Sequence, residues 1–292
     1  MLEFRPITLK DEAKIRLYMS LSPSKQLINC FEAFYLWRDV LSVEWTESGG
    51  FAIFKVHYQS GKPRFIFPFG SGDPVDIILR LKDYCLKKGY PLSFAKLRGE
   101  QVLYLQNHFP GELTVATHRD HAEYLFDTRI FHHYSGKALQ PKRNFVNYAR
   151  RHYDWHYEAI TPANLPECRI FAGKFNGDES FEDDNQALIN ALSEFEALPV
   201  KGSLIRIGSD ISSLFICTML GDEETAAGLF LRGDHDKKGI IPLMYQVYFL
   251  HHPEFRYFNF GEDLGVEGLR KNKLSFQPME IMELYEVTFS DR

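Results

Sequence analysis

The order of the predicted helices and strands constrains the fold of this chain most, because that order occurs twice. Short apolar runs bounded by Gly or Pro predict strands, and apolar residues three or four positions apart predict helices. The first half reads strand, helix, helix, three strands, helix, strand, helix, strand, at residues 2–7, 9–19, 25–38, 42–46, 51–58, 63–68, 75–88, 92–97, 100–108 and 113–117. The second half repeats this order at residues 155–160, 162–175, 184–197, 203–207, 213–220, 225–232, 240–251, 257–260, 266–275 and 279–289. A repeated order without obvious residue identity indicates two copies of one α/β unit.

This order of elements resembles that of the GNAT acyltransferase fold. We therefore predict an α/β (α+β) protein with two tandem GNAT-like acyltransferase domains, each a mixed sheet flanked by helices. The N-terminal domain is placed at residues 1–135, and the C-terminal domain, which includes a connecting basic helix, at residues 136–292. No Pro-, Ser- or Gly-rich linker separates the halves, so we expect them to pack against each other.

Composition excludes several classes of protein. A net charge of −5 over 292 residues argues against a protein that coats nucleic acid non-specifically, although a local basic groove stays open. The N-terminus lacks a signal-peptide pattern and no apolar run approaches the roughly 20 residues that cross a bilayer, so we expect no integral membrane segment and a cytoplasmic protein. Peripheral contact with a membrane is left open. The four cysteines show no metal-binding spacing and are expected to be buried thiols: Cys30, Cys85, Cys168 and Cys217.

The stretch YFNFGEDLGVEGLRKNKLSFQP, residues 257–278, is the first candidate site. Its aromatic start predicts a strand end, which Gly261 terminates. The acidic residues Glu262 and Asp263 follow, and Asp263 is predicted to cap a basic helix that begins near Leu264. Ligands commonly bind at the carboxyl edge of strands in open α/β sheets.

A second polar segment is the predicted helix KRNFVNYARRHY, which begins near Pro141. Arg143, Asn147 and Arg150 are spaced i, i+4 and i+7, so they form one polar stripe on this helix.

Two segments resemble the signatures of a known family. EYLFDTRIFHHYSGKALQPKRNFVNYARR, residues 123–151, resembles Y-L-Y…L…L-G-K…K-R-N-x-[IV]-N-x-[FY]. NFGEDLGVEGLRKNKLSFQP, residues 259–278, resembles N-x-x-x-D-L-G-x-x-G-L-R-x-x-K-x-x-x-x-P. Both are signatures of bacterial stand-alone proteins related to the C-terminal domain of phosphatidylglycerol lysyltransferases, and they occur here in the family's order.

The resemblance implies transfer of an aminoacyl group from an aminoacyl-tRNA to a lipid, peptide or small-molecule acceptor. In the lipid-modifying relatives the acceptor is phosphatidylglycerol and a membrane-spanning region precedes the catalytic domain. The sequence shows no such region, so the resemblance alone does not assign phosphatidylglycerol as the acceptor of this chain. The architecture is also similar to that of peptidoglycan-bridge aminoacyltransferases, which leaves peptide and soluble acceptors open.

Acyl transfer requires positioning, a route for the proton and stabilisation of a developing oxyanion. Asp263 or Glu262 could orient an ammonium group or act as the base. The candidates for binding substrate are the cations and the amide of the two segments: Lys142, Arg143, Asn147, Arg150, Arg270 and Lys273. The alternative interpretation is that Arg143 and Arg270 form structural ion pairs, with Asp263 and Glu267 as partners.

An acyl-CoA-dependent N-acyltransferase is the main alternative function, and a non-catalytic ligand-binding module is another. The GNAT pyrophosphate turn, Q/R-x-x-G-x-G/A, is absent from residues 231–242, where Asp234 and Asp236 would repel a pyrophosphate. We therefore predict no cofactor, with acetyl-CoA or another acyl-CoA as the alternative.

Two further patterns are interpreted as structural. Side chains of adjacent residues diverge, so neither His132–His133 nor His251–His252 supplies two ligands easily, and no metal site is predicted. The Gly70-Ser71-Gly72-Asp73-Pro74 segment enters a helix as phosphate-binding loops do, but it lacks their spacing and is interpreted as a simple loop.

Overall fold

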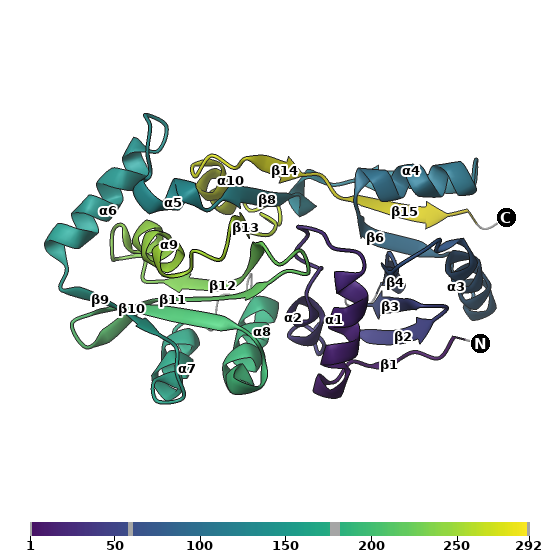
Figure 1. The fold of residues 1–292 in the computed structure, drawn as a ribbon, viewed down its shortest axis with the longest axis horizontal. Helices are drawn as coiled ribbons and strands as arrows, with labels where there is room; N and C mark the ends of the chain where they lie inside the picture. The colour runs from purple at the N-terminus through teal and green to yellow at the C-terminus, as the bar shows by residue number, and fades with distance from the viewer. Residues whose placement is uncertain (1, 58–60, 176–181, 291–292) are drawn as a thin grey trace.

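Two mixed sheets lie side by side in the computed structural model of the protein, which describes residues 2–57, 61–175 and 182–290 (Figure 1). The first sheet has the order β1-β2-β3-β4-β6-β15-β7, with β5 paired to β3. Its strands are β1 Arg5–Pro6, β2 Glu44–Ser48, β3 Phe51–Val56, β4 Arg64–Ile66, β5 Phe69–Gly70, β6 Ser93–Leu97, β7 Leu113–Thr117 and β15 Tyr285–Phe289. The second sheet has the order β14-β8-β13-β12-β11-β10-β9. Its strands are β8 Glu123–Asp127, β9 Trp155–Ala159, β10 Lys201–Ile207, β11 Asp210–Met219, β12 Thr225–Gly233, β13 Tyr257–Asn259 and β14 Glu280–Met282.

Helices cover both faces of each sheet. Those of the first half are α1 Glu12–Ser20, α2 Phe31–Tyr35, α3 Val75–Lys88 and α4 Gly99–His108. Those of the second half and the connection are α5 Arg129–His133, α6 Gln140–His152, α7 Leu165–Gly173, α8 Glu182–Ser193, α9 Ile240–His251 and α10 Glu267–Leu274. Short 3₁₀ turns are η1 Leu9–Asp11, η2 Arg119–His121 and η4 Phe195–Ala197. None of the helices in the described ranges has the length and apolarity needed to cross a membrane.

One hydrophobic core runs through both halves. It joins side chains of α1, α2 and β3 to side chains of α7, α8, β11 and β12. At the contact, Trp37 stacks on Phe230 with ring centroids 5.0 Å apart. Two further cores fill the opposite faces, one under α3 and α4 and one under α5, α6 and α9. The expected packing of the two halves against each other is confirmed.

The two sheets exchange strands. β8, which precedes the connection, pairs with β13 and β14 in the second sheet, whereas β15 pairs with β6 and β7 in the first. The prediction of one final strand at 279–289 is therefore wrong, because the chain leaves one sheet after Met282 and enters the other at Tyr285. The proposed boundary between residues 135 and 136 falls between α5 and α6 and stays a prediction.

The predicted helix at 25–38 is also wrong, since only Phe31–Tyr35 is α-helical. The preceding residues bond to distant parts of the chain instead. Gln26 Nε2 donates to the Lys96 carbonyl at 2.8 Å, and the Leu27 amide donates to Glu123 Oε2 at 2.9 Å. These contacts replace the i→i−4 bonds of a helix. The four cysteines are buried free thiols, as predicted.

Candidate functional site

The turn that follows β13 brings the two halves together. Gly261, Leu264 and Gly265 all have positive φ, and the Leu264 amide donates to the Asp120 carbonyl at 3.0 Å. The predicted helix cap at Asp263 is wrong, because α10 begins at Glu267, three residues after the predicted start near Leu264, with Val266 as its N-cap. The Asp263 carboxylate accepts a hydrogen bond from the Gly265 amide at 3.0 Å and so shapes the turn itself.

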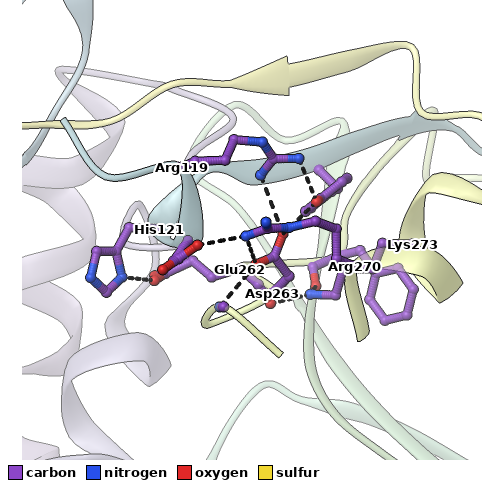
Figure 2. A network of polar contacts seen from close by, with 10 residues as sticks. Arg119, His121, Glu262, Asp263, Arg270 and Lys273 are labelled. Carbon is purple, nitrogen blue, oxygen red and sulfur yellow. Dashed lines mark hydrogen bonds and ion pairs between the residues drawn. The ribbon is translucent and has the colours of Figure 1, made fainter. Parts of the chain in front are cut away.

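Asp263 lies at the centre of a network of cations, with no exposed surface (Figure 2). Arg270 donates from Nε at 2.9 Å and from Nη2 at 2.8 Å, and Arg119 donates from Nη1 at 3.2 Å. The Tyr124 hydroxyl donates to the same carboxylate at 2.5 Å. Burial raises the pKa of Asp263, but the hydrogen bonds from Arg270 and Tyr124 outweigh burial and hold this pKa well below its usual range. An ionised carboxylate with this many donors is a poor base.

The alternative interpretation of Arg270, a structural ion pair with Asp263 and Glu267, therefore fits in part, since Arg270 pairs with Asp263. It also contacts Asp120 at 2.6 Å, whereas Glu267 pairs with Lys271, one turn along α10.

Glu262 points to different partners. Its carboxylate contacts the amine of Lys96, from β6 of the first sheet, and accepts from His121 Nδ1 at 2.7 Å. The Glu262 side chain is 13% exposed and that of His121 is 52% exposed, so this pair is accessible from solvent. Burial, together with the nearby charge of Lys96, lowers the pKa of His121. Of the two predicted catalytic carboxylates, Glu262 is thus the one whose own side chain has exposed surface, since Asp263 has none.

Lys273 lies beneath the same turn. Its amine donates to the carbonyls of Phe260, at 2.7 Å, and Glu262, and it lies over the rings of Phe260 and Tyr124. Burial lowers the pKa of Lys273 to about 7, opposed by the negative charges of Asp263 and Glu123.

Glu123 adds a buried carboxylate at the junction. Its Oε2 accepts from the Leu27 amide at 2.9 Å and from Asn259 Nδ2 at 2.6 Å. Its Oε1 has no hydrogen-bond partner within the described ranges. Buried polar atoms are usually paired, so this oxygen is an exception within the junction.

The predicted residues of α6 separate into two groups. Lys142 reaches the candidate site, because its amine lies 3.3 Å from Asn272 Oδ1 and 3.7 Å from the centroid of Phe276, and burial lowers its pKa to about 8. The two segments that resemble the family signatures, residues 123–151 and 259–278, thus contact each other in the fold.

The other α6 residues have different neighbours. Arg143 donates to the carbonyls of Tyr134 and Gly136 and holds the connection from α5. Arg150 bonds to Gln246 on α9 and lies over Trp155, whereas Asn147 is exposed.

Sequence reasoning missed the partners that the first half and β8 supply: Lys96, Arg119, His121, Glu123 and Tyr124. The charged run Arg119–His121 between two strands was a usable signal. Lys96 gave none, because one lysine in an apolar strand looks like a solvent-facing residue.

The loop before α9 does not form a pyrophosphate cradle. The Asp236 amide donates to Asp234 Oδ1 at 3.0 Å, and the Lys237 amide donates to the Asp234 carbonyl at 3.1 Å. Gly239 packs against α6 so closely that an added Cβ would lie 2.1 Å from the Phe145 carbonyl oxygen. Amides already bonded within the loop, beside two aspartates, do not fit the phosphates of CoA.

The family model described as phosphatidylglycerol lysyltransferase, C-terminal, matches residues 21–288 of the sequence. The chain belongs to this family. The predicted resemblance is confirmed. No curated protein matches the sequence.

Solved structures extend the comparison over the whole chain. A conserved protein of unknown function from Bacteroides thetaiotaomicron VPI-5482 has 26% identity and a TM-score of 0.93, covering 99% of this chain and 100% of that protein. L-PGS from Bacillus licheniformis has 16% identity and a TM-score of 0.69, covering 97% and 93% of the two chains. A tandem GNAT protein from the clavulanic acid biosynthesis pathway has 10% identity and a TM-score of 0.55, covering 100% and 99%. The predicted tandem GNAT fold is confirmed, and family and fold together support an acyltransferase of this type.

Proposed function

We propose that this protein transfers an aminoacyl group from an aminoacyl-tRNA to a lipid, peptide or small-molecule acceptor in the cytoplasm. The observation that carries the proposal is the accessible Glu262–His121 pair, which a turn between the two halves holds beside Lys96. Membership of the lysyltransferase C-terminal family supports aminoacyl transfer over other acyl transfers.

Glu262 is the proposed base. In the proposed step the nitrogen or oxygen of the acceptor attacks the ester carbonyl carbon of the aminoacyl-tRNA. A bond forms between the acyl carbon and the acceptor, and the bond from that carbon to the ribose oxygen breaks. The acceptor's proton passes to the Glu262 carboxylate, with His121 beside it, and then to the leaving ribose oxygen.

Asp263 is proposed to act through Arg270 as a positioning residue. Arg270 is 31% exposed while Asp263 is fully buried, so the carboxylate fixes the guanidinium and leaves part of it facing solvent. A fixed guanidinium suits a phosphate or carboxylate of the substrate. Lys273 and Lys142, both with lowered pKa values, are proposed to bind substrate on the α10 side of the turn.

The exposed face of α6 is the proposed contact with tRNA. α6 contains no acidic residue, and Phe145 and Tyr148 are exposed on it. The amine of Lys238 lies 5.4 Å and 5.0 Å from the centroids of these rings. Cations interleaved with aromatic rings suit phosphate contacts and base stacking, and Asn147 and Arg150 belong to the same helix.

The test uses purified protein with tRNAs charged with each radiolabelled amino acid. Candidate acceptors are phosphatidylglycerol vesicles, a peptidoglycan-precursor peptide and a cell extract. We expect loss of aminoacyl-tRNA and transfer of label to one class of acceptor. Glu262→Gln should lower the rate about 100-fold or more, as the loss of a general base does. Its matched control is Glu267→Gln, because Glu267 is exposed and pairs with Lys271 within α10.

Two results would count against the proposal. One is that no charged tRNA is consumed with any amino acid, and the other is that Glu262→Gln retains the unaltered rate. Calorimetry with acetyl-CoA separates the acyl-CoA alternative, for which the loop before α9 predicts no binding. A non-catalytic module would bind a ligand without consuming either donor.

A further inference from the structure

The first half contains a cavity of about 170 Å³ that the proposed reaction does not use. It lies where the parallel strands β4 and β6 separate, because these strands pair only at Phe65–Phe94 and Ile66–Ala95. Beyond this point the segments that follow β4 and β6 diverge, and residues from both segments border the cavity. The carboxyl ends of diverging parallel strands are a common place for ligands in α/β folds. This volume is large enough for several water molecules or for a small organic molecule.

Two cations line the cavity, and no carboxylate is found among its lining residues in the described part of the chain. Lys96 adopts φ of +61° within β6, a conformation that is costly for a residue with a side chain and that the surroundings must hold in place. Its side chain is 15% exposed. The Lys96 amine contacts Glu262, so this lysine lies between the cavity and the proposed site.

Arg98 contributes an unsatisfied donor. Its Nη2 pairs with Glu100 at 2.7 Å, but its buried Nε has no hydrogen-bond partner in the described part of the chain. Buried guanidinium nitrogens without a partner are costly. The Arg98 side chain as a whole is 32% exposed and lines the cavity, so its guanidinium is available to an anion there.

The remaining walls suit a small organic anion. α4 begins at Gly99, directly after Arg98, so the positive end of its dipole adds to the two cations. Gln101 and Ser24 add neutral polar groups, and Phe67 adds an apolar wall. Gly72, from the glycine-rich segment interpreted above as a simple loop, borders the same cavity.

We propose that this cavity binds a small organic anion, whose carboxylate or phosphate meets Arg98 and Lys96 while its apolar part lies against Phe67. The proposal concerns a site in the first half and requires no aminoacyl-tRNA. An occupant would also give Lys96 a second anionic partner besides Glu262.

Isothermal titration calorimetry at low salt, without tRNA, tests the proposal. The probes are inorganic phosphate, glycerol 1-phosphate and propionate, with glycerol as the neutral control. We expect at least one anion to bind and glycerol not to bind. Tighter binding of glycerol 1-phosphate than of inorganic phosphate would assign a phosphate ester, and binding of propionate alone would assign a carboxylate.

Two variants place the binding in this cavity. Arg98→Gln removes one of the two cations that line the cavity. Ser24→Leu places a larger side chain in the cavity and leaves both cations in place. Each variant should weaken binding at least tenfold. Arg129→Gln is the matched control, because Arg129 is exposed and pairs with Asp127. Thermal unfolding verifies that the variants fold. Absence of binding by all three anions, or unchanged affinity in both cavity variants, would overturn the proposal.

Discussion

At position 263 a carboxylate without exposed surface is held by two arginines, a tyrosine and a backbone amide. Asp120 contacts the same Arg270 but is 54% exposed. These two aspartates therefore offer a matched comparison of a buried and an exposed partner. The buried one stabilises the junction because its removal leaves Arg270 and Arg119 without their shared anion.

We expect Asp263→Asn to lower the free energy of unfolding by about 3 kcal/mol, the cost of breaking a buried pair. Asp120→Asn should cost less than about 1 kcal/mol, as exposed pairs do. Because the folded pKa of Asp263 is depressed, its stabilisation is complete above the unfolded pKa of about 4 and is lost as pH falls further. Urea denaturation of both variants at pH 7 and at pH 3 measures this. Equal costs for the two variants at pH 7 would contradict the structural role of Asp263.

The residues of the site that are neighbours in the sequence could be predicted, and those that only the fold brings together could not. Asp263, Arg270 and Lys273 lie close in the sequence, so one segment contained all three. Arg119 and Lys96 are far from them in the chain, and only the fold brings them to the turn. Local patterns carry no information on such pairs, since the spacing that matters is spatial.

Elements with strong local signals were predicted well. α3, β7 and α9 have the predicted bounds. α3 ends at Lys88, and Gly89 follows as its C-cap with a positive φ that suits glycine and terminates the helix. The predicted helix at 25–38 and the final strand at 279–289 failed because tertiary bonds, which local propensity does not reflect, determine those segments.

The close contact between α6 and the start of α9 predicts that two glycine substitutions will differ in their cost to stability. Gly239 and Gly89 both have positive φ, +85° and +78°, but only Gly239 faces another element. Gly89→Ala should cost about 1 kcal/mol for its backbone alone. Gly239→Ala should cost about 3 kcal/mol, because the added Cβ also collides with the backbone of α6. Urea denaturation followed by circular dichroism compares them, and equal costs would show that α6 moves aside freely.

For the whole molecule, the shared core and the exchanged strands predict cooperative unfolding. Trp45 reports on the first half, Trp155 reports on the second, and Trp37, which stacks on Phe230, reports on the contact between them. In a Trp155→Phe variant, and separately in a Trp37→Phe/Trp45→Phe variant, the fluorescence midpoint should coincide with that of far-ultraviolet circular dichroism. Separate midpoints within either variant would show that the halves unfold independently.

The position of β15 also has a consequence for the protein during its synthesis. β7 ends at Thr117, but its neighbour in the sheet begins at Tyr285. A chain emerging from the ribosome therefore carries β6 and β7 with an empty place between them until most of the second half has been translated. Unpaired strand edges attract other chains. We expect the nascent first half to depend on chaperones, and to be released from them only when the last strand arrives.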